Sequence, residues 1–346
     1  MGRAPNSRLE TLLRQSERRG RFLVVRDPSL QRSARHLAAK QELVKPAPRV
    51  YARKEQWNSL SKRERMIRTI QAVQQIHPEW TFCSNSAAAV LGLPINLDDL
   101  ETIHVTTTSS QRAGSTKRVR RHIVEGDEPI FLRGIRTTSF ARTVLDCMRG
   151  SDFRMAIAVA DSALRFGPLG RAALVSYFRS AGRHLQGTNI AIGAMLCADP
   201  RSESVGESLA RATMIESGFA LPELQTVLPH PLDARRSFRV DFLWMREDGS
   251  RVVGEFDGAV KYEDPAIRNG KSALRVLEDE RKRESLLTFY GMPVVRFSYK
   301  DVMGRDGLCR LLKRFGIPYS RRMEDGFRRS ISNRKPSVLT FSISEF

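Results

Sequence analysis

The clearest hydrophobic pattern in the chain is an alternation within residues 238–262, FRVDFLWMREDGSRVVGEFDGAVKY. Every second position from Val240 to Trp244 is apolar, and a second apolar run starts at Val252. Period-two alternation predicts β-strands. Asp248-Gly249, between the two runs, is a frequent turn sequence. The segment is therefore predicted to be a β-hairpin.

Three carboxylates interrupt this apolar hairpin: Asp241, Glu255 and Asp257. Acidic residues are depleted in strands, although any one of them alone is compatible with a solvent-facing position. Glu255 and Asp257 are two residues apart and so project from the same face. A shared cation is the simplest explanation. It requires Asp241 on that face, which predicts a three-residue loop over 248–250, pairing 241 with 257, or a β-bulge.

These residues carry a family resemblance. Asp241, the run Glu255-Phe256-Asp257-Gly258 and Lys261 resemble the PD-(D/E)XK nuclease superfamily, specifically its branch related to very-short-patch-repair endonucleases, in which an ExDG strand replaces ExK. Upstream, SVGESLARATMIESGFALPELQ resembles the first helix of the family, with Glu207 at its acidic position. Downstream, DERKRESLLTFYGMPVVRF resembles the second helix and the closing strand. Lys261 stands where many relatives carry His.

The resemblance implies hydrolysis of phosphodiester bonds with Mg²⁺ or Mn²⁺ as cofactor. Asp241 and Glu255 are the expected metal ligands, and Asp257 is a further ligand or an orienting group. Glu207 is expected to hold a metal-bound water, and Lys261 to position the attacking water or stabilise the charge that develops on phosphate. Two basic residues of the same region are candidate phosphate contacts: Arg281 and Arg296.

Helical spacing of apolar residues dominates the start of the chain. Leucines on one face of 8–19, and a second apolar face after Pro28, predict two helices. A small hairpin is predicted in LVKPAPRVYAR. This order is that of a winged helix-turn-helix, with Arg32, Arg35 and Lys40 available for a DNA groove. A helical cap with a solvated basic face explains the same periodicity.

Four short motifs of the next hundred residues are SNSAAAVLGLPI, ETIHVTTT, RVRRHIV and GIRTTSFARTVLDCMR. They resemble the AbiEi-type antitoxin and related regulator family, which carries an N-terminal winged helix, and the match covers 5–150. One departure is a long helical approach over 57–80. A basic loop here either follows a phosphate backbone or is simply solvated; its residues are Arg112, Lys117, Arg118, Arg120 and Arg121. His104 and His122 are interpreted as packed or exposed strand residues without ligand partners.

The predicted fold is a multi-domain α/β protein. Its predicted parts are an N-terminal winged helix-turn-helix over 1–55, an AbiEi-like α+β middle domain over 56–150, a helical connector over 151–200, a restriction-endonuclease-like α/β domain with a mixed sheet over 201–318 and a basic, mobile tail over 319–346.

Net charge indicates which binding partners are favoured, and cysteine usage indicates the cellular compartment. The formal net charge is +20 and the pI is about 10.6, a balance that favours nucleic acid as partner over a charge that only maintains solubility. Four scattered cysteines without CxxC spacing indicate buried thiols in a reducing cytoplasm. No secretory signal and no apolar run of membrane-spanning length is visible, so no membrane association is expected.

Two functional hypotheses remain. The first is a DNA-binding, metal-dependent endonuclease. The second is an AbiEi-type antitoxin or transcriptional regulator whose nuclease-like domain is catalytically inactive, with a toxin as partner. Retention of the acidic residues and Lys261 favours the enzyme. The choice of DNA or RNA, the target and the oligomeric state, a homodimer included, stay open.

Overall fold

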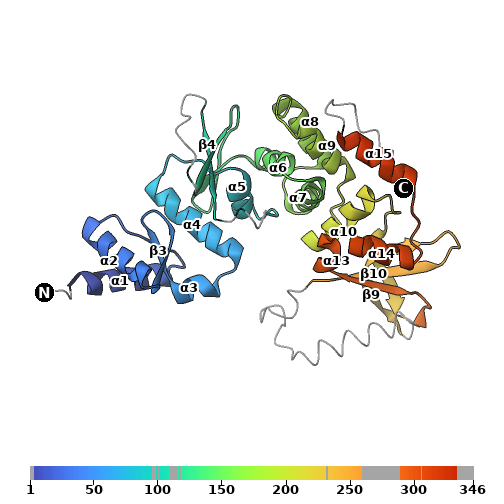
Figure 1. The fold of residues 1–346 in the computed structure, drawn as a ribbon, viewed down its shortest axis with the longest axis horizontal. Coiled ribbons are helices and arrows are strands. Elements are labelled where there is room, and N and C mark those ends of the chain that lie inside the picture. Colours follow the sequence, from blue (N-terminus) through green and yellow to red (C-terminus); the bar gives the residue numbers. More distant parts are fainter. Residues whose placement is uncertain are drawn as a thin grey trace. The chain divides into compact units, whose positions relative to one another are not determined.

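The computed structural model describes most of the chain, in two compact units, Met1–Cys147 and Met148–Phe346 (Figure 1). The described residues are 4–95, 99, 101–108, 116, 118–230, 233–258, 289–304 and 306–332. They form an α/β protein with several sheets, including a mixed sheet of four strands, as the sequence predicts. Within these ranges no helix is long and apolar enough to cross a membrane.

The N-terminal unit, Met1–Cys147, begins with two helices and a small sheet. Its first elements are α1 (Ala4–Arg18), β1 (Leu23–Val24), α2 (Pro28–Ala39), β2 (Leu43–Ala47) and β3 (Val50–Arg53). The strands pair antiparallel in the order β1-β3-β2. α2 begins at Pro28 because the Asp27 carboxylate accepts from the backbone N–H groups of Ser29 and Leu30. The two predicted helices and the hairpin are therefore confirmed.

The rest of this unit alternates helices and short strands. Its elements are α3 (Lys54–Ser59), α4 (Lys62–Ile76), α5 (Ser84–Leu91), β4 (Ile103–Thr107), β5 (Val119–Ile123), β6 (Ile130–Leu132), β7 (Ile135–Thr137) and α6 (Phe140–Arg149), which crosses the boundary between the units. β4 and β5 pair in parallel. The helical approach expected over 57–80 is divided between α3 and α4. Ser61 and Glu64 form a capping box that starts a new helix.

The C-terminal unit, Met148–Phe346, combines helices with the four-stranded sheet. Its elements are α7 (Phe153–Phe166), α8 (Arg171–Ala181), α9 (Thr188–Cys197), α10 (Val205–Glu216), β8 (Glu223–His230), β9 (Asp233–Met245), β10 (Arg251–Asp257), β11 (Val294–Ser298), α13 (Tyr299–Met303), α14 (Asp306–Arg314) and α15 (Arg321–Ser332). Part of the predicted tail is thus a helix. Phe327 of α15 is buried and packs edge-on against Phe153, with 4.7 Å between ring centroids.

The sheet has the strand order β11-β10-β9-β8. β10 pairs in parallel with β11 and antiparallel with β9, and β9 pairs antiparallel with β8. Phe242, Trp244 and Phe297 from the sheet share one buried cluster with Leu209 of α10 and Leu312 of α14. Figure 1 shows α10, α13 and α14 lying over β9 and β10. This packing brings the N-terminal turn of α10 to the strands that carry the predicted acidic residues.

Candidate active site

The loop between β9 and β10 sets the register of the predicted acidic residues. Arg246 N donates to Ser250 O at 2.8 Å, which leaves the three residues 247–249 as the loop. Asp248 Oδ1 accepts from Ser250 N at 2.9 Å, and Gly249 has φ +77°. Glycine adopts this left-handed conformation without steric cost. The loop has the predicted length of three residues, but it spans 247–249, so the predicted loop over 248–250 is wrong by one residue.

This register brings Asp241 and Glu255 to the same end of the ladder. The last pair in the ladder is Gly254 with Phe242, so Asp241 and Glu255 are the next residues on the two strands, and the predicted pairing of 241 with 257 is wrong. Beyond this pair Asp241 Oδ2 accepts from Phe256 N at 3.0 Å, so its carboxylate links the strands where their regular pairing ends. Within the described part of the chain, Asp241 Oδ1 accepts no hydrogen bond.

Glu207 enters from the N-terminal turn of α10, which Ser204 caps. Its carboxylate is buried and accepts from Glu203 N and Ser204 Oγ, each at 2.8 Å, and from Gln225 Nε2 at 3.0 Å. Burial raises the pKa of Glu207 above its ordinary value, and the negative charge of Asp241 acts in the same direction against these hydrogen bonds. The two carboxylates are therefore electrostatically coupled.

Gly206 allows α10 to approach β10 this closely. A Cβ atom at Gly206 would lie 2.0 Å from Cζ and 2.2 Å from Cε1 of the Phe256 ring. No side chain fits that space unless the helix or the ring moves. Gly206 is not among the predicted site residues. The available signal was a glycine in the first turn of a helix whose acidic residue was expected in the site.

A cavity of about 560 Å³ opens beside Glu207 and Asp241. Its lining residues are Glu203, Ser204, Glu207, Phe238, Arg239, Asp241, Phe256 and Gly258. Glu203 binds two guanidinium groups, with Arg165 Nη2 at 3.0 Å and Arg239 Nη1 at 2.9 Å. Glu255 and Asp257 are not among the described residues that line this space. Only two of the predicted acidic residues therefore meet at the cavity.

Glu255 and Asp257 lie beside the last strand of the sheet. Glu255 is buried, and its partner position on β11 is Arg296. Arg296 Nη1 lies 3.8 Å from Asp257 Oδ1, so the predicted phosphate contact already has an anionic neighbour. Lys261 and Arg281, also predicted for this site, lie outside the described residues.

Asp241 and Glu255 can be tested as a pair of metal ligands. In the described ranges no three His, Cys, Asp or Glu side chains are placed so that they could hold one ion together. Mg²⁺ commonly takes one or two protein carboxylates and completes its shell with water and substrate oxygens. Asp241 and Glu255, the residues that directly follow the last ladder pair, fit that smaller donor set in number and chemistry, and Oδ1 of Asp241 is not hydrogen-bonded to any described residue.

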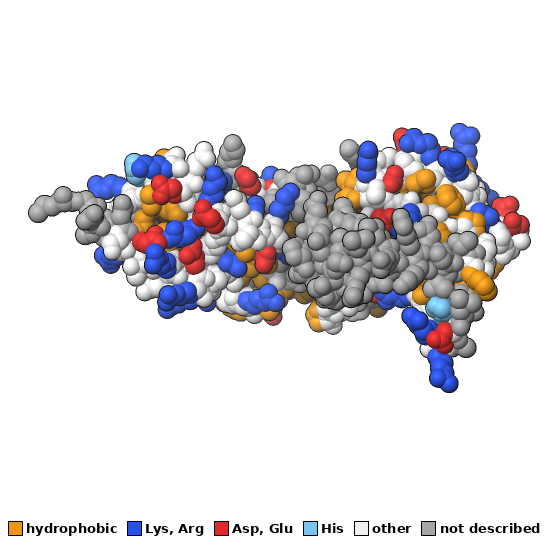
Figure 2. Space-filling view, turned by 90° about the horizontal axis from the view of Figure 1, so that it is seen from below, with side chains coloured by type: hydrophobic (Ala, Val, Ile, Leu, Met, Phe, Trp, Pro, Cys, Tyr) orange, Lys and Arg blue, Asp and Glu red, His pale blue; other side chains and the backbone are white. Residues whose placement is uncertain are grey.

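The predicted DNA-contacting side chains of α2 are exposed. Arg32, Arg35 and Lys40 face solvent, and Arg35 Nη2 donates to Gln31 Oε1 at 3.2 Å. None of the three forms an ion pair with another described residue. Figure 2 shows Lys and Arg side chains over the visible face of this unit, with acidic side chains among them. The positive charge is therefore spread out.

The described arginines of the predicted basic loop all contact other residues of the chain. Arg118 Nη1 donates to two backbone carbonyls, Arg120 Nη1 lies 3.4 Å from Asp99 Oδ2, and Arg121 Cζ lies 5.2 Å from the centroid of the Trp80 ring. Arg112 and Lys117 lie outside the described residues.

His104 is packed, which is one of the two interpretations of these strand histidines, and its ring has neighbours that no spacing in the sequence indicates. His104 Nδ1 lies 2.8 Å from His122 Nε2, and His104 Nε2 lies 2.8 Å from Asp99 Oδ2. The parallel pairing of β4 with β5 brings the two rings together. Burial lowers the pKa of His104, and the negative charge of Asp99 opposes that shift.

Comparison of the chain with protein-family models, curated proteins and solved structures gives no match.

Proposed function

We propose that residues 201–318 form a PD-(D/E)XK-type domain that hydrolyses phosphodiester bonds in DNA. The observation that carries the proposal is the position of Asp241 and Glu255 directly beyond the last pair of the β9–β10 ladder, with Glu207 and Asp241 lining one cavity. Packing alone does not explain this grouping, because like charges that are close together and partly buried disfavour the ionised state.

Asp241 and Glu255 would hold the cofactor, Mg²⁺ or Mn²⁺. The bound ion would supply neutralisation of phosphoryl charge, activation of a water molecule and help for the leaving oxygen. Asp241 suits this role because Phe256 N fixes one carboxylate oxygen and leaves the other without a hydrogen-bond partner among the described residues.

Glu207 would orient a water molecule at the cavity. A carboxylate offers about four acceptor positions, and three donors occupy Glu207 in the structure. One position therefore remains for a water molecule. Because its other bonds fix the carboxylate, that water would have a defined direction. Asp257 would act as a further ligand or as an orienting group on β10. Lys261 would stabilise the charge that develops on the phosphate.

The N-terminal unit would bring the domain to DNA. Arg32 and Arg35 on α2 and Lys40 directly after it are exposed, and the formal net charge of +20 favours association with a phosphate backbone. Arg120 and Arg121 would add contacts that do not depend on sequence.

The test is a cleavage assay of the purified full chain on duplex DNA, single-stranded DNA and RNA. We expect DNA cleavage with Mg²⁺ or Mn²⁺ and none in EDTA. Cleavage that is equal in EDTA would reject a metal-dependent site.

A regulator of the antitoxin type is the second candidate. It is favoured by the position of Glu255 and Asp257, which are not among the described residues that line the cavity. In that case the chain would bind DNA tightly without cutting any substrate under any divalent ion. The domain would then serve as a platform for a toxin partner or for a second copy of the chain.

A further inference from the structure

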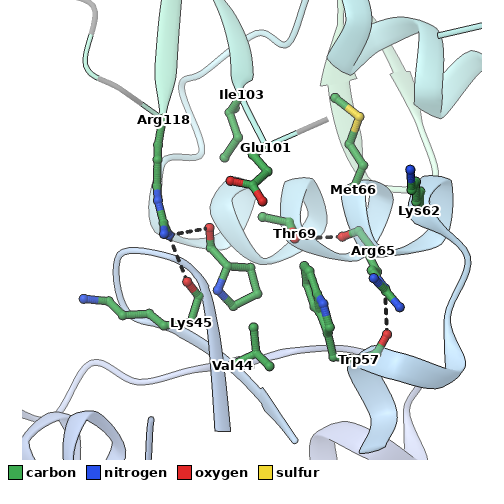
Figure 3. Close-up of a pocket in the computed structure, with 11 residues that line it drawn as sticks. Val44, Lys45, Trp57, Lys62, Arg65, Met66, Thr69, Glu101, Ile103 and Arg118 are labelled. Carbon is green, nitrogen blue, oxygen red and sulfur yellow. Dashed lines mark hydrogen bonds between the residues drawn. The ribbon is translucent and has the colours of Figure 1, made fainter. Parts of the chain in front are cut away.

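A second cavity lies wholly within the N-terminal unit (Figure 3). Its volume is about 410 Å³, within the range of about 300–1,000 Å³ that is typical of small-molecule sites. Its lining residues are Val44, Lys45, Pro46, Trp57, Lys62, Arg65, Met66, Thr69, Glu101, Ile103 and Arg118. They come from the β2–β3 hairpin, α3, α4, β4 and the approaches to β4 and β5.

The lining is apolar at its base and charged at its edge. Met66 and Ile103 are buried, Trp57 is half-buried, and Lys62, Glu101 and Arg118 are exposed. Figure 3 shows Trp57 and Glu101 pointing toward the space from opposite sides, whereas the Lys45 side chain points away. The cavity therefore suits a ligand with a flat ring and a charged end.

Arg65 is fixed beside the Trp57 ring. Its Nε donates to Trp57 O at 2.7 Å and its Nη2 to Asn58 O at 3.3 Å, and its Cζ lies 5.2 Å from the indole centroid. These hydrogen-bond acceptors are neutral. A guanidinium carries five N–H donors, so several donors of Arg65 remain for a ligand.

Arg118 is held in a similar way at the other side. Its Nη1 donates to Lys45 O at 2.9 Å and to Pro46 O at 3.1 Å. Across the described ranges, Lys62, Arg65 and Arg118 form no ion pair with a carboxylate, and neither does Glu101 with a base. Three cations and one carboxylate therefore edge the cavity without compensating partners from the described chain.

We propose that this cavity binds a nucleotide, with the base against Trp57 and the phosphate at Arg65, Arg118 and Lys62. Indole faces stack on nucleobases, and guanidinium groups match phosphate oxygens. Glu101 accepts from ring N–H groups. Guanine presents two adjacent donors to a carboxylate and adenine only its amino group, so guanine is the preferred base. The ligand is a free nucleotide or an unstacked nucleotide of a single strand. This proposal is independent of the nuclease site.

The test measures binding to the full chain by titration calorimetry, with GMP, GTP, AMP, guanosine and pyrophosphate as probes. We expect GTP and GMP to bind more tightly than guanosine, and GMP more tightly than AMP. A single-stranded DNA tetranucleotide of guanine distinguishes a site for free nucleotides from a site for single-stranded DNA. It should bind more tightly than GMP only if the cavity accepts a nucleotide within a strand. Displacement of the tetranucleotide by GMP would place both in one cavity.

Conservative variants locate the site. Glu101→Gln should remove the preference for GMP over AMP, and Arg118→Gln should weaken GMP at least about tenfold, since bonds to charged groups are the stronger ones. Trp57→Phe should retain part of the affinity that Trp57→Ala loses. Arg18→Gln, at an exposed arginine that ends α1 and does not line the cavity, is the matched control and should leave GMP binding unchanged.

Two results would overturn the proposal. One is the absence of binding by GMP, GTP and the tetranucleotide at millimolar concentration. The other is binding that Glu101→Gln, Arg118→Gln and Trp57→Phe all leave unchanged, because the nucleotide would then lie elsewhere. Glu101 is exposed and has no ion-pair partner among the described residues, so its variant tests binding without threatening the fold.

Discussion

Gly206→Ala should destabilise the C-terminal unit by crowding the contact between α10 and β10. The added methyl group would lie 2.0 Å from the nearest carbon of the Phe256 ring. Carbon atoms in contact are about 3.5–4.0 Å apart. The ring or the helix therefore has to shift by about 1.5 Å or more.

The surroundings of Phe256 make that shift costly. The ring is buried, and its centroid lies 6.1 Å from that of Phe297 and 6.2 Å from that of Tyr299. Overpacking of a filled core costs about 1–3 kcal/mol. In an unstrained helix the same substitution would gain about 0.5–1 kcal/mol, so the sign of the effect distinguishes crowding from helix propensity.

Urea unfolding followed by Trp244 fluorescence measures this change in a Trp57→Phe, Trp80→Phe background, because Trp244 is then the single tryptophan and lies in the C-terminal unit. Gly326→Ala is the matched control. A Cβ atom there meets nothing within 4 Å, so this variant should be as stable as the wild type or more stable. A Gly206→Ala chain that is also at least as stable as the wild type would refute the close approach.

Three further predictions follow from charges. Because the folded-state pKa of Glu207 is raised, its contribution to stability is greatest below the unfolded pKa and is lost as pH rises through the folded pKa. Glu207→Gln should flatten this decline in the free energy of unfolding, measured by urea unfolding from acid to neutral pH. A decline as steep as that of the wild type would contradict the prediction. The double variant Arg32→Gln, Arg35→Gln should lower the salt dependence of DNA binding by about two counterions. Fluorescence anisotropy at several salt concentrations measures this dependence. An unchanged slope of log affinity against log salt would show that α2 is not part of the DNA interface. Arg211 Nη2 forms a buried ion pair with Asp161 Oδ1 at 3.0 Å, so Arg211→Met should cost about 3–5 kcal/mol; a thermal midpoint equal to that of the wild type would contradict this.

Local patterns predicted the elements that depend on neighbouring residues. Asp27 before Pro28 indicates a capped helix start, and the alternation around Asp248-Gly249 indicates a hairpin. The three-residue loop followed from a geometric requirement, namely that Asp241 share a face with Glu255. The observed loop, 247–249, has the expected length but begins one residue earlier, and Asp248 accepts from Ser250 N within this turn.

Local sequence patterns do not predict contacts between segments that are distant in the chain. Parallel pairing of β4 with β5 brings His104 to His122, and no spacing in the sequence shows which strands are neighbours. The approach of Gly206 to Phe256 likewise depends on how α10 packs on the sheet. The helix around Phe327 was taken for tail because its charged face dominates its composition.

A pair of isosteric variants tests the proposed role of Asp241 in metal-dependent cleavage of DNA. Asp241→Asn and Asp248→Asn remove the same charge from one hairpin, but Asp248 lies in the loop at the far end from the cavity. Single-turnover cleavage of duplex DNA in Mg²⁺, with DNA affinity measured alongside, separates chemistry from binding. We expect Asp241→Asn to abolish cleavage while affinity is kept, and Asp248→Asn to cut at the wild-type rate. Full cleavage by Asp241→Asn would contradict the account.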